Sequence, residues 1–315
     1  MKEAYILGID TSNYKTSVAI VSCSGEIVCN IQEYLEVKKG ERGLRQSDAL
    51  FQHINKLPEL IERAFQILGN RKISAVSVSS RPRSVDGSYM PVFNAGLSAG
   101  RIISSALSVP MFTNSHQEGH VEAVKHGSSL EDSRELVSFH FSGGTTEALL
   151  VKDDSVTLAG GTKDLAMGQV LDRLGVTLGM SFPCGAEMDQ VTEETVRPEK
   201  NILTRIKIKD CYFNLSGIET QAQRAAGTVP EEDLIYMIFE RLAEAVAGLC
   251  RELKRKYGVN DFLFAGGVSS SCFMRKYLKE NLKEFNLCFG DPALSTDNAV
   301  GTALLGGKKL WQLNQ

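Results

Sequence analysis

Two of the five histidines in this 315-residue chain stand four residues apart, in the run Asn114-Ser-His-Gln-Glu-Gly-His120. On an α-helix, residues at i and i+4 lie on one face, so His116 and His120 could share one metal ion. Gln117 occupies the position of the catalytic glutamate in H-E-x-x-H peptidases, which disfavours that kind of hydrolysis. An isolated pair with this spacing could equally be a surface feature, and two ligands are too few for a metal site.

A third metal ligand is available in the run Leu294-Ser-Thr-Asp-Asn-Ala-Val300, just before the last expected helix. Its Asp297 carries a carboxylate, a ligand type that zinc, iron and magnesium accept. The same side chain could instead cap the N-terminus of the following helix, because it can accept a backbone N–H. The residues alone leave both roles of Asp297 open.

Three glycine-containing turns offer backbone N–H groups to an anion. Glycine lets the backbone approach a phosphate closely, and successive N–H groups can form an anion nest. The same sequences would also make ordinary β-turns or a tight strand-to-helix connection, and none is a Walker A loop or a G-x-G-x-x-G fingerprint. The candidate nucleotide- or substrate-binding residues in these turns are Asp10, Thr11 and Ser12; Phe141, Ser142, Gly143, Gly144 and Thr145; and Gly266 and Gly267.

The hydrophobic pattern predicts elements that place each of these turns at the end of a strand. In the first half we expect strands over 5–10, 17–22, 27–32, 73–79 and 109–113, and helices over 48–68 and 95–107. In the second half we expect strands over 136–141, 147–152, 156–159, 261–264 and 286–289, and helices over 165–178, 231–257, 270–281 and 298–312. Residues 200–214 are expected to form loop and β-hairpin.

This order predicts an α/β protein made of two similar β-β-β-α-β-α domains around a nucleotide cleft. We expect the first domain to span residues 1–113, with a C-terminal helix at 299–315 packing back on it. The second domain would span residues 114–298. The length suits two domains, and the halves share an architecture with little residue-level similarity.

Composition narrows the class of protein. The formal net charge of -3 and the isoelectric point near 6.0 argue against a uniformly basic nucleic-acid-binding surface, although a local basic patch is compatible with them. The seven cysteines are scattered without a C-x-x-C pair, which indicates free thiols in a reducing compartment. Because we find neither a signal-peptide pattern nor an apolar run long enough to cross a bilayer, we expect a cytoplasmic protein without membrane contact.

The motifs, taken together and in order, resemble the TsaD family, also called the glycoprotease family, over nearly the whole chain. Its members have the ASKHA fold shared by actin, the heat-shock chaperone ATPases and the sugar kinases. The matching runs are Gly8-Ile-Asp-Thr-Ser12 with G-I-E-T-S, His116 to His120 with H-x-E-G-H, Ser142 to Thr146 with S-G-G-H-T, Phe182 to Ala186 with Y-P-G-G-P, Phe213 to Gly217 with F-S-F-S-G, Ala265 to Ser271 with A-G-G-V-A-A-N, and Ser295 to Ala299 with C-T-D-N-A. The His pair combined with Thr-Asp-Asn-Ala is the specific part.

The resemblance implies an enzyme that transfers a threonylcarbamoyl group from its adenylate to an adenosine in tRNA. It implies that His116, His120 and Asp297 hold one divalent ion, which could be iron, zinc or magnesium. It also implies ATP or threonylcarbamoyl-adenylate as the bound nucleotide. The implied partners are tRNA, a paralogous scaffold protein and an ATPase subunit.

By position, the resemblance assigns a nucleotide site in the second half. Phe141 to Thr145 would cradle phosphates or the carbamoyl-adenylate. Asp172 and Gly185 would contact the sugar of the nucleotide, and Ser271 stands where the family has asparagine. From its own surroundings, Asp172 would otherwise be a solvated or salt-bridged residue on a helix.

Several residues depart from the family pattern. Thr145 replaces a histidine, Ser271 an asparagine and Glu219 a lysine, and Cys184 and Ala186 interrupt the Gly-Gly-Pro run. Most of these changes fall at the implied nucleotide site, whereas the metal ligands are all present. Two alternatives therefore remain: a divergent non-catalytic paralog that binds metal or nucleotide and a protein partner, and a carbamoyl or acyl transferase with another acceptor.

Overall fold

The computed structural model describes residues 3–12, 14–37, 44–85, 87–153, 155–291, 293–313 and 315, and the chain divides into two compact units. Unit 1 comprises Met1–Gly127 and Ala293–Gln315, and unit 2 comprises Ser128–Pro292. These limits differ from the expected boundaries at 113/114 and 298/299. The segment after residue 113 falls in unit 1 because the helix that it forms packs against the C-terminal helix.

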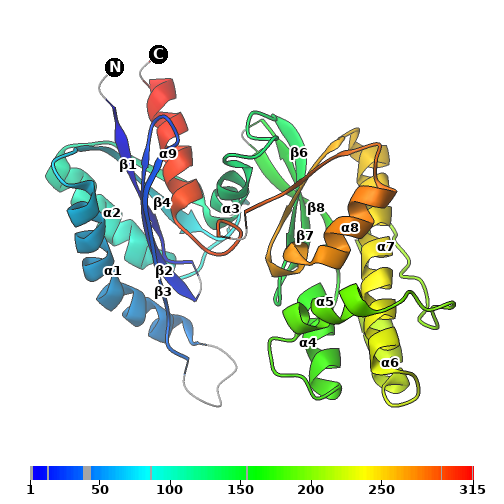
Figure 1. The fold of residues 1–315 in the computed structure, drawn as a ribbon. Coiled ribbons are helices and arrows are strands. Elements are labelled where there is room, and N and C mark those ends of the chain that lie inside the picture. Colours follow the sequence, from blue (N-terminus) through cyan, green and yellow to red (C-terminus); the bar gives the residue numbers. More distant parts are fainter. Residues whose placement is uncertain are drawn as a thin grey trace. The chain divides into compact units, whose positions relative to one another are not determined.

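Unit 1 contains a five-stranded mixed sheet (Figure 1). Its strands are β1 (Tyr5–Asp10), β2 (Lys15–Ser22), β3 (Ile27–Tyr34), β4 (Ile73–Arg81) and β5 (Met111–Ser115), in the order β3-β2-β1-β4-β5. The first three strands pair antiparallel, while β1, β4 and β5 run parallel. The carboxyl ends of the parallel strands therefore meet at one edge of the sheet, which is where ligands bind in open α/β sheets.

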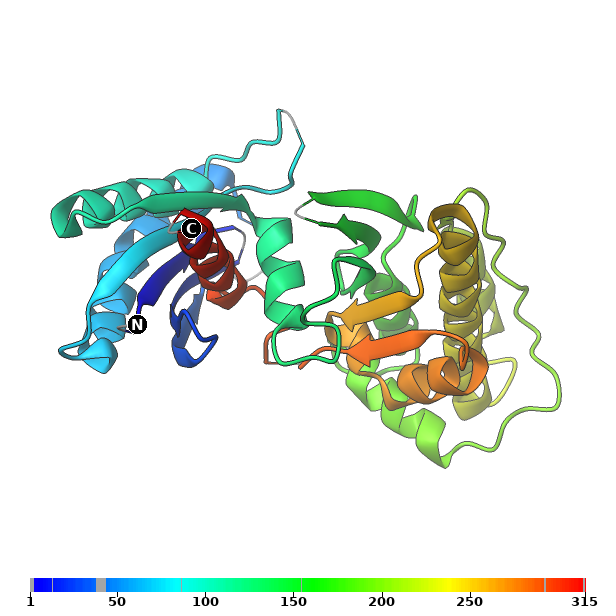
Figure 2. The same cartoon turned by 90° about the horizontal axis from the view of Figure 1, so that it is seen from above.

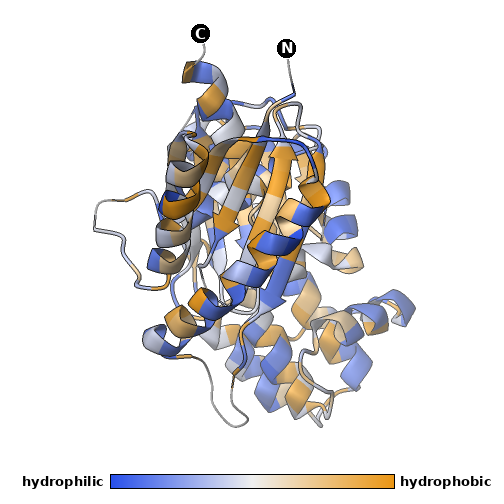
Figure 3. Cartoon of the chain, turned by 90° about the vertical axis from the view of Figure 1, so that its left-hand side faces the viewer, coloured by the Kyte–Doolittle hydropathy of each residue, from blue (hydrophilic) through white to orange (hydrophobic). Residues whose placement is uncertain are grey.

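Helices cover both faces of this sheet, as the two views of Figures 1 and 2 show. One face carries α1 (Gln46–Leu68) and α2 (Phe93–Leu107), and the other carries α9 (Val300–Leu313), against which α3 (His116–Lys125) packs. The side chains of each strand are shared between the two faces of the sheet, because successive residues point to opposite faces. Leu7 and Ile9 join the core with α1 and α2, whereas Ile6 packs with α9. The strands are mostly hydrophobic in Figure 3, as expected for a sheet covered on both faces.

Unit 2 contains a six-stranded sheet with the order β11-β10-β6-β7-β8-β9. Its strands are β6 (Glu135–Phe141), β7 (Thr146–Lys152), β8 (Ser155–Thr162), β9 (Tyr212–Phe213), β10 (Asp261–Ala265) and β11 (Asn286–Phe289). Apart from the added β9, the pairing repeats that of unit 1: three antiparallel strands followed by two parallel ones. The prediction of two similar β-β-β-α-β-α units is confirmed.

The helices of unit 2 are α4 (Met167–Thr177), α5 (Gly185–Glu194), α6 (Ser216–Ala225), α7 (Glu231–Tyr257) and α8 (Cys272–Asn281), with a 3₁₀ turn, η1, at Gly267–Ser270. The sequence pattern predicted α4, α7 and α8 but not α5 or α6. Residues 200–214 are mainly irregular and contain the short β9. The expected hairpin is present only as a minimal turn, in which Lys209 and Tyr212 pair antiparallel around Asp210 and Cys211, both at positive φ. None of the described helices of the chain is both long and apolar enough to cross a bilayer.

Candidate metal centre and nucleotide pocket

The three predicted metal ligands lie together in unit 1. His116 and His120 occupy the first two turns of α3 and face Asp297, which lies in the loop before α9. The Nε2 atom of His120 is 2.9 Å from Asp297 Oδ1, and that of His116 is 3.5 Å from the same oxygen. One ligand atom from each residue falls within 4.8 Å of the other two. The structure therefore brings together residues that are almost 180 positions apart in the sequence.

The local sequence explains why α3 begins at His116. Ser115 Oγ accepts a hydrogen bond from the Glu118 backbone N–H at 3.1 Å, and the Glu118 carboxylate accepts from the Ser115 N–H at 2.6 Å. This capping box satisfies two N–H groups at the helix start and gives Glu118 a structural role. We did not predict it, although the Ser-x-x-Glu spacing is a readable signal. Its effect is to fix the direction in which the two histidines leave the helix.

Asp10, at the end of β1, supports the first histidine. Its Oδ2 lies 2.8 Å from His116 Nδ1 and accepts a hydrogen bond from Ser79 Oγ at 2.5 Å, while its Oδ1 accepts from the Ser12 N–H at 2.9 Å. Asp10 is 1% exposed, so this carboxylate is buried and fully hydrogen-bonded within unit 1. A carboxylate that holds the Nδ1–H of a histidine leaves Nε2 free to bind a metal.

The charges of this group perturb one another strongly. Burial by itself would lower the pKa of His116, but the carboxylates of Asp10 and Asp297 outweigh it and raise this pKa to about 10. Burial would raise the pKa of Asp297, but hydrogen bonds from His116 and His120 hold it well below its usual range. Without a metal, His116 is therefore a cation held between two carboxylates. A divalent ion could replace the proton on its Nε2.

The donor set fits a divalent transition metal. Two imidazole nitrogens and one carboxylate oxygen are common ligands of zinc and non-haem iron, and three protein ligands leave positions for water or substrate. The hydrogen bond from His116 Nδ1 to Asp10 is the outer support that such ligands usually have. All three ligand side chains are partly exposed, at 13% to 25%, so a small ligand can reach them.

The other two candidate residues of the first turn are buried inside unit 1. Thr11 Oγ1 donates a hydrogen bond to the Val92 carbonyl at 3.0 Å and accepts one from the Gly96 N–H at 3.2 Å, so it ties β1 to α2. Ser12 is 3% exposed, and its Oγ has no hydrogen-bond partner among the described residues. Asp10 thus contacts the predicted ligand His116, and all three residues belong to a different unit from the other glycine turns.

In unit 2, the turn between β6 and β7 presents an open backbone. Ser142 Oγ accepts hydrogen bonds from the N–H groups of Gly144 and Thr145, at 3.3 Å and 3.0 Å, which folds the turn on itself. A Cβ built on Gly143 or Gly144 would meet no atom within 4 Å, so both are accessible to a ligand. Phe141, by contrast, is fully buried in the core, and only its backbone can contribute to this turn.

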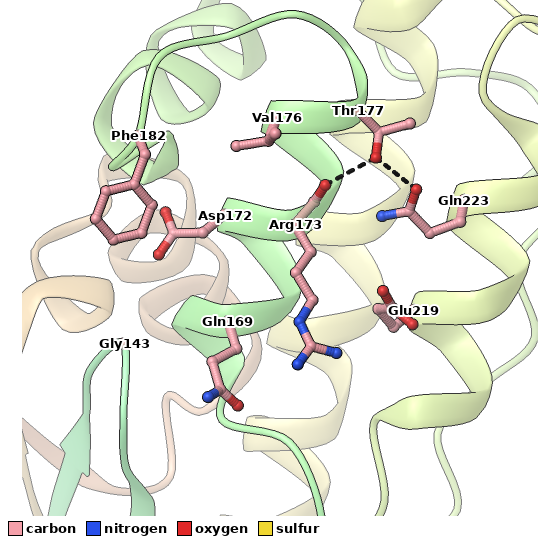
Figure 4. A pocket seen from close by; sticks show the side chains of 9 residues that line it. All are labelled: Gly143, Gln169, Asp172, Arg173, Val176, Thr177, Phe182, Glu219 and Gln223. Atoms are coloured by element: carbon pink, nitrogen blue, oxygen red, sulfur yellow. Dashed lines mark hydrogen bonds between the residues drawn. The ribbon is translucent and has the colours of Figure 1, made fainter. Parts of the chain in front are cut away.

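A pocket of about 630 Å³ opens beside this turn, between α4 and α6 (Figure 4). It is lined by Gly143, Gln169, Asp172, Arg173, Val176, Thr177, Phe182, Glu219 and Gln223. Val176 and Phe182 offer apolar surface, Asp172 and Glu219 are acidic, and Figure 4 shows the Arg173 side chain between Gln169 and Glu219. Such a mixture of an aromatic wall and a few polar groups is typical of a site for a small organic ligand. The sequence did not indicate the roles of Arg173, Gln223 or Phe182 in this pocket.

The other predicted nucleotide residues of unit 2 have different surroundings. Asp172 Oδ1 accepts a hydrogen bond from the Cys184 N–H at 2.9 Å, which places the N-terminus of α5, and hence Gly185, next to the pocket wall. Gly266 has φ +89°, and a Cβ there would lie 2.3 Å from the Phe141 carbonyl oxygen, so the site requires glycine. Gly267 begins the 3₁₀ turn and faces open space.

The hydroxyl group of Ser271 is engaged in a hydrogen bond within unit 2. Its hydroxyl hydrogen-bonds to the carboxylate of Asp189 on α5, and the same carboxylate accepts the N–H groups of Cys272 and Phe273, at 2.7 Å and 3.2 Å. Asp189 thereby fills the N-terminus of α8, the position at which a helix would otherwise attract a phosphate. We did not predict this contact.

A family model described as tRNA N6-adenosine threonylcarbamoyltransferase, TsaD, matches residues 26–304. The chain belongs to the TsaD family. A curated relative of that name from Neorickettsia sennetsu is 28% identical over 310 residues, covering 95% of this chain and 92% of the relative. Another relative of that name, from Streptococcus pneumoniae, is 26% identical over 310 residues, covering 95% of this chain and 90% of the relative. The TsaD resemblance found in the motifs is thereby confirmed.

Solved structures show the fold of this TsaD-family chain. HypF from T. kodakarensis has a TM-score of 0.66 at 13% identity, covering 98% of this chain and 48% of HypF. The component A of (R)-2-hydroxyglutaryl-CoA dehydratase from Acidaminococcus fermentans has a TM-score of 0.56 at 18% identity, with 97% and 98% covered. A ROK hexokinase from Thermus thermophilus has a TM-score of 0.54 at 15% identity, with 98% and 99% covered. The predicted ASKHA fold is confirmed.

Proposed function

We propose that this chain transfers a threonylcarbamoyl group from an adenylate to an adenosine amine of tRNA, with a divalent ion held by His116, His120 and Asp297. The observation that carries this proposal is the convergence of two Nε2 atoms and one carboxylate within 4.8 Å. The relatives named tRNA N6-adenosine threonylcarbamoyltransferase support the substrate and the acceptor. We also propose that it acts in the cytoplasm with a paralogous scaffold protein and an ATPase.

In this reaction, the adenosine amine nitrogen attacks the carbonyl carbon of the threonylcarbamoyl group. A new C–N bond forms, the bond from that carbon to the adenylate oxygen breaks, AMP leaves with the electron pair, and the amine proton passes to solvent. When bound, the metal supplies Lewis-acid stabilisation of negative charge. Asp10 keeps the His116 ring oriented through Nδ1.

The residues of unit 2 would bind the nucleotide part. The turn leaves open space beside Gly143 and Gly144 for a phosphate, and the Oδ1 bond of Asp172 to Cys184 leaves its other oxygen for a sugar hydroxyl. The Phe182 ring is 74% exposed at the pocket, so a base could stack on it. These assignments support an adenylate in the pocket between α4 and α6.

The proposal is tested by incubating tRNA with the protein, threonine, bicarbonate, ATP and the companion scaffold and ATPase proteins. Mass analysis of the nucleosides should show threonylcarbamoyl-adenosine with the wild type. The His116→Ala variant should give none and should contain no stoichiometric metal. Product from wild type and His116→Ala at equal rates would contradict the proposed role of the metal site.

A second candidate function is a non-catalytic relative that binds metal and a protein partner. The contact between Ser271 and Asp189 favours it, because Asp189 occupies a helix N-terminus that could have held phosphate. Calorimetry with ADP and with a threonylcarbamoyl-adenylate analogue separates the two functions. Absence of nucleotide binding in metal-loaded protein would favour the non-catalytic relative.

A further inference from the structure

Lys15, at the start of β2, is a buried cation whose hydrogen bonds and ring contact with described residues are all with neutral groups. Its side chain is 7% exposed, although lysine is seldom buried unless it is paired. The Nζ atom lies 3.0 Å from Gln32 Oε1, 3.0 Å from Thr296 Oγ1 and 4.7 Å from the centre of the Tyr34 ring. All three partners are neutral, and none of the ion pairs between described residues includes Lys15. The residues that the structure describes therefore give its charge no carboxylate partner.

The direction of β2 places this charge on the same side of the sheet as the metal ligands. Ala19 and Val21 pack with α9, so Lys15, which has the same parity along the strand, faces that side as well. Asp10 on β1 shares this face, since its carboxylate reaches His116 on α3. Thr296, which touches the ammonium, is followed directly by the ligand Asp297, and consecutive Cα atoms are about 3.8 Å apart.

A divalent ion would leave this region with an excess of positive charge. Two neutral imidazoles contribute nothing, and the carboxylates of Asp10 and Asp297 together balance the two charges of the ion. The positive charge of the Lys15 ammonium is then not balanced by any of these groups, and the side chain that carries it is buried. An anion of the ligand would neutralise it, and charge-assisted hydrogen bonds of this kind are among the stronger ones.

We propose that Lys15, together with the bound metal, binds an oxyanion group of the ligand, a carboxylate or a phosphate, in unit 1. This proposal rests on the proposed metal site. Thr296 is exposed, and its hydroxyl occupies one donor of the ammonium until the anion replaces it. No motif indicated this role, because the run from Gly8 to Thr16 was considered for its backbone, its carboxylate and its hydroxyls, whereas Lys15 lies at the start of the next strand. Lys15 would act by positioning the ligand next to the metal.

The test uses the full-length, zinc-loaded protein and two probes, N-carbamoyl-L-threonine and inorganic phosphate, titrated by calorimetry. Lys15→Met should weaken binding of one probe by about tenfold or more, because it removes a charged hydrogen-bond donor. Lys15→Arg, which keeps the charge, should recover most of that affinity. The probe that is affected identifies the group as carboxylate or phosphate. Phosphate bound at the Ser142–Thr145 turn of unit 2 would be unchanged in Lys15→Met.

Two further variants separate anion binding from a structural role. Gln32→Leu removes a neutral partner of the ammonium and should leave the affinity within about twofold. Thr296→Val removes the competing hydroxyl and should bind the probe more tightly than wild type, which decides the matter even if Lys15→Met does not fold. Weaker binding by Thr296→Val would overturn the proposal.

Zinc content is measured for every variant, so that failure of the metal site is recognised separately. Wild type without stoichiometric zinc would contradict the metal site and this proposal together. Zinc-loaded Lys15→Met that binds both probes as tightly as wild type would overturn the role of Lys15 alone. Because neither probe experiment contains tRNA, a failure of the transfer reaction does not affect the result.

Discussion

At the scale of single residues, we expect Asp10 to control the metal affinity of the proposed site, although it is not one of the proposed ligands. It is buried and it holds His116 through Nδ1. Such outer partners fix the ring orientation and raise the basicity of the ligand nitrogen. The metal affinity of the chain should therefore depend on a residue in β1 as well as on the ligands in α3 and before α9.

Asp10→Asn should raise the dissociation constant for zinc by about 10- to 100-fold, because the amide no longer provides a charged acceptor for His116. Competition with a chromogenic chelator measures this constant. Ser79→Ala is the matched control, because it removes a hydrogen bond to the same carboxylate and keeps its charge. An effect of Ser79→Ala as large as that of Asp10→Asn would mean that hydrogen bonding, and not charge, supports the site.

Metal binding should also depend on pH, because the pKa of His116 is raised to about 10 in the metal-free protein. Below that pH the imidazole carries a proton on Nε2, which must leave before the metal binds. The apparent zinc affinity should therefore rise about tenfold per pH unit between pH 7 and 8.5, with release of close to one proton from His116. Calorimetry in buffers of different ionisation enthalpy counts the protons, and a buffer-independent enthalpy would contradict the raised pKa.

The same linkage acts on folding in the absence of metal. Because the pKa of His116 is higher in the folded protein than the ordinary value of 6.5, its contribution to stability is fully present below pH 6.5. That contribution is lost as the pH rises towards 10. The opposite holds for Asp297, whose lowered pKa gives stability that is lost only as the medium becomes strongly acidic. The candidate ligands could be proposed from residue type and spacing, but this coupling to Asp10 could not, because it joins positions 106 residues apart.

At the scale of elements, the crossing of α3 and α9 positions the proposed metal ligands. A Cβ on Gly301 would lie 1.8 Å from the Gly119 carbonyl oxygen and 2.6 Å from the Ala123 nitrogen. The two helices therefore approach with their backbones almost in contact, which brings Asp297 to the first turns of α3. The glycines in H-x-E-G-H and at the start of α9 are needed for this approach.

Gly301→Ala should lower the free energy of unfolding by about 3 kcal/mol, because the added methyl group meets backbone atoms that cannot move aside. It should also reduce zinc binding, since α3 must shift. Gly307→Ala is the matched control on the same helix: its Cβ would meet only Ile6 Cγ1 at 3.7 Å, and alanine is the better helix former. Urea unfolding and zinc content measure both effects, and equal stability of the two variants would contradict the close helix crossing.

The sequence predicted some of these elements better than others, for a physical reason. The central strands of both sheets and the long helix α7 have many buried apolar residues, so their hydrophobic pattern was clear. In α5 only Met188 and Thr192 are buried, and in α6 only Ile218, Ala222 and Ala225. Helices with so few buried positions give little periodic signal. The helix α8 has as few, Met274 and Leu278, but it lies between the recognisable strands β10 and β11. Since both border the pocket or its neighbouring loops, the pocket could not be assembled from the sequence.

At the scale of the whole molecule, the two units repeat one topology and carry different chemistry at corresponding places. In unit 1 the end of β1 carries Asp10, whereas in unit 2 the end of β6 leads into the Ser142–Thr145 turn. The order of elements predicted this repeat. The differing chemistry follows from individual side chains, which the repeat does not determine.

Because each unit has its own core and its own candidate site, a ligand should stabilise the unit that binds it. Hydrogen exchange on the full-length protein should show that zinc slows exchange in α3 and residues 293–299, while an adenylate analogue slows exchange in Ser142–Thr145 and α4. At a ligand concentration of 100 times the dissociation constant, the stabilisation is about 2.7 kcal/mol.

His116→Ala should abolish only the zinc effect, and Asp172→Ala should weaken only the adenylate effect. If zinc slowed exchange in α4 of the His116→Ala variant, the metal would bind elsewhere; if the adenylate analogue protected α3 and left α4 unchanged, the pocket of unit 2 would not be its site.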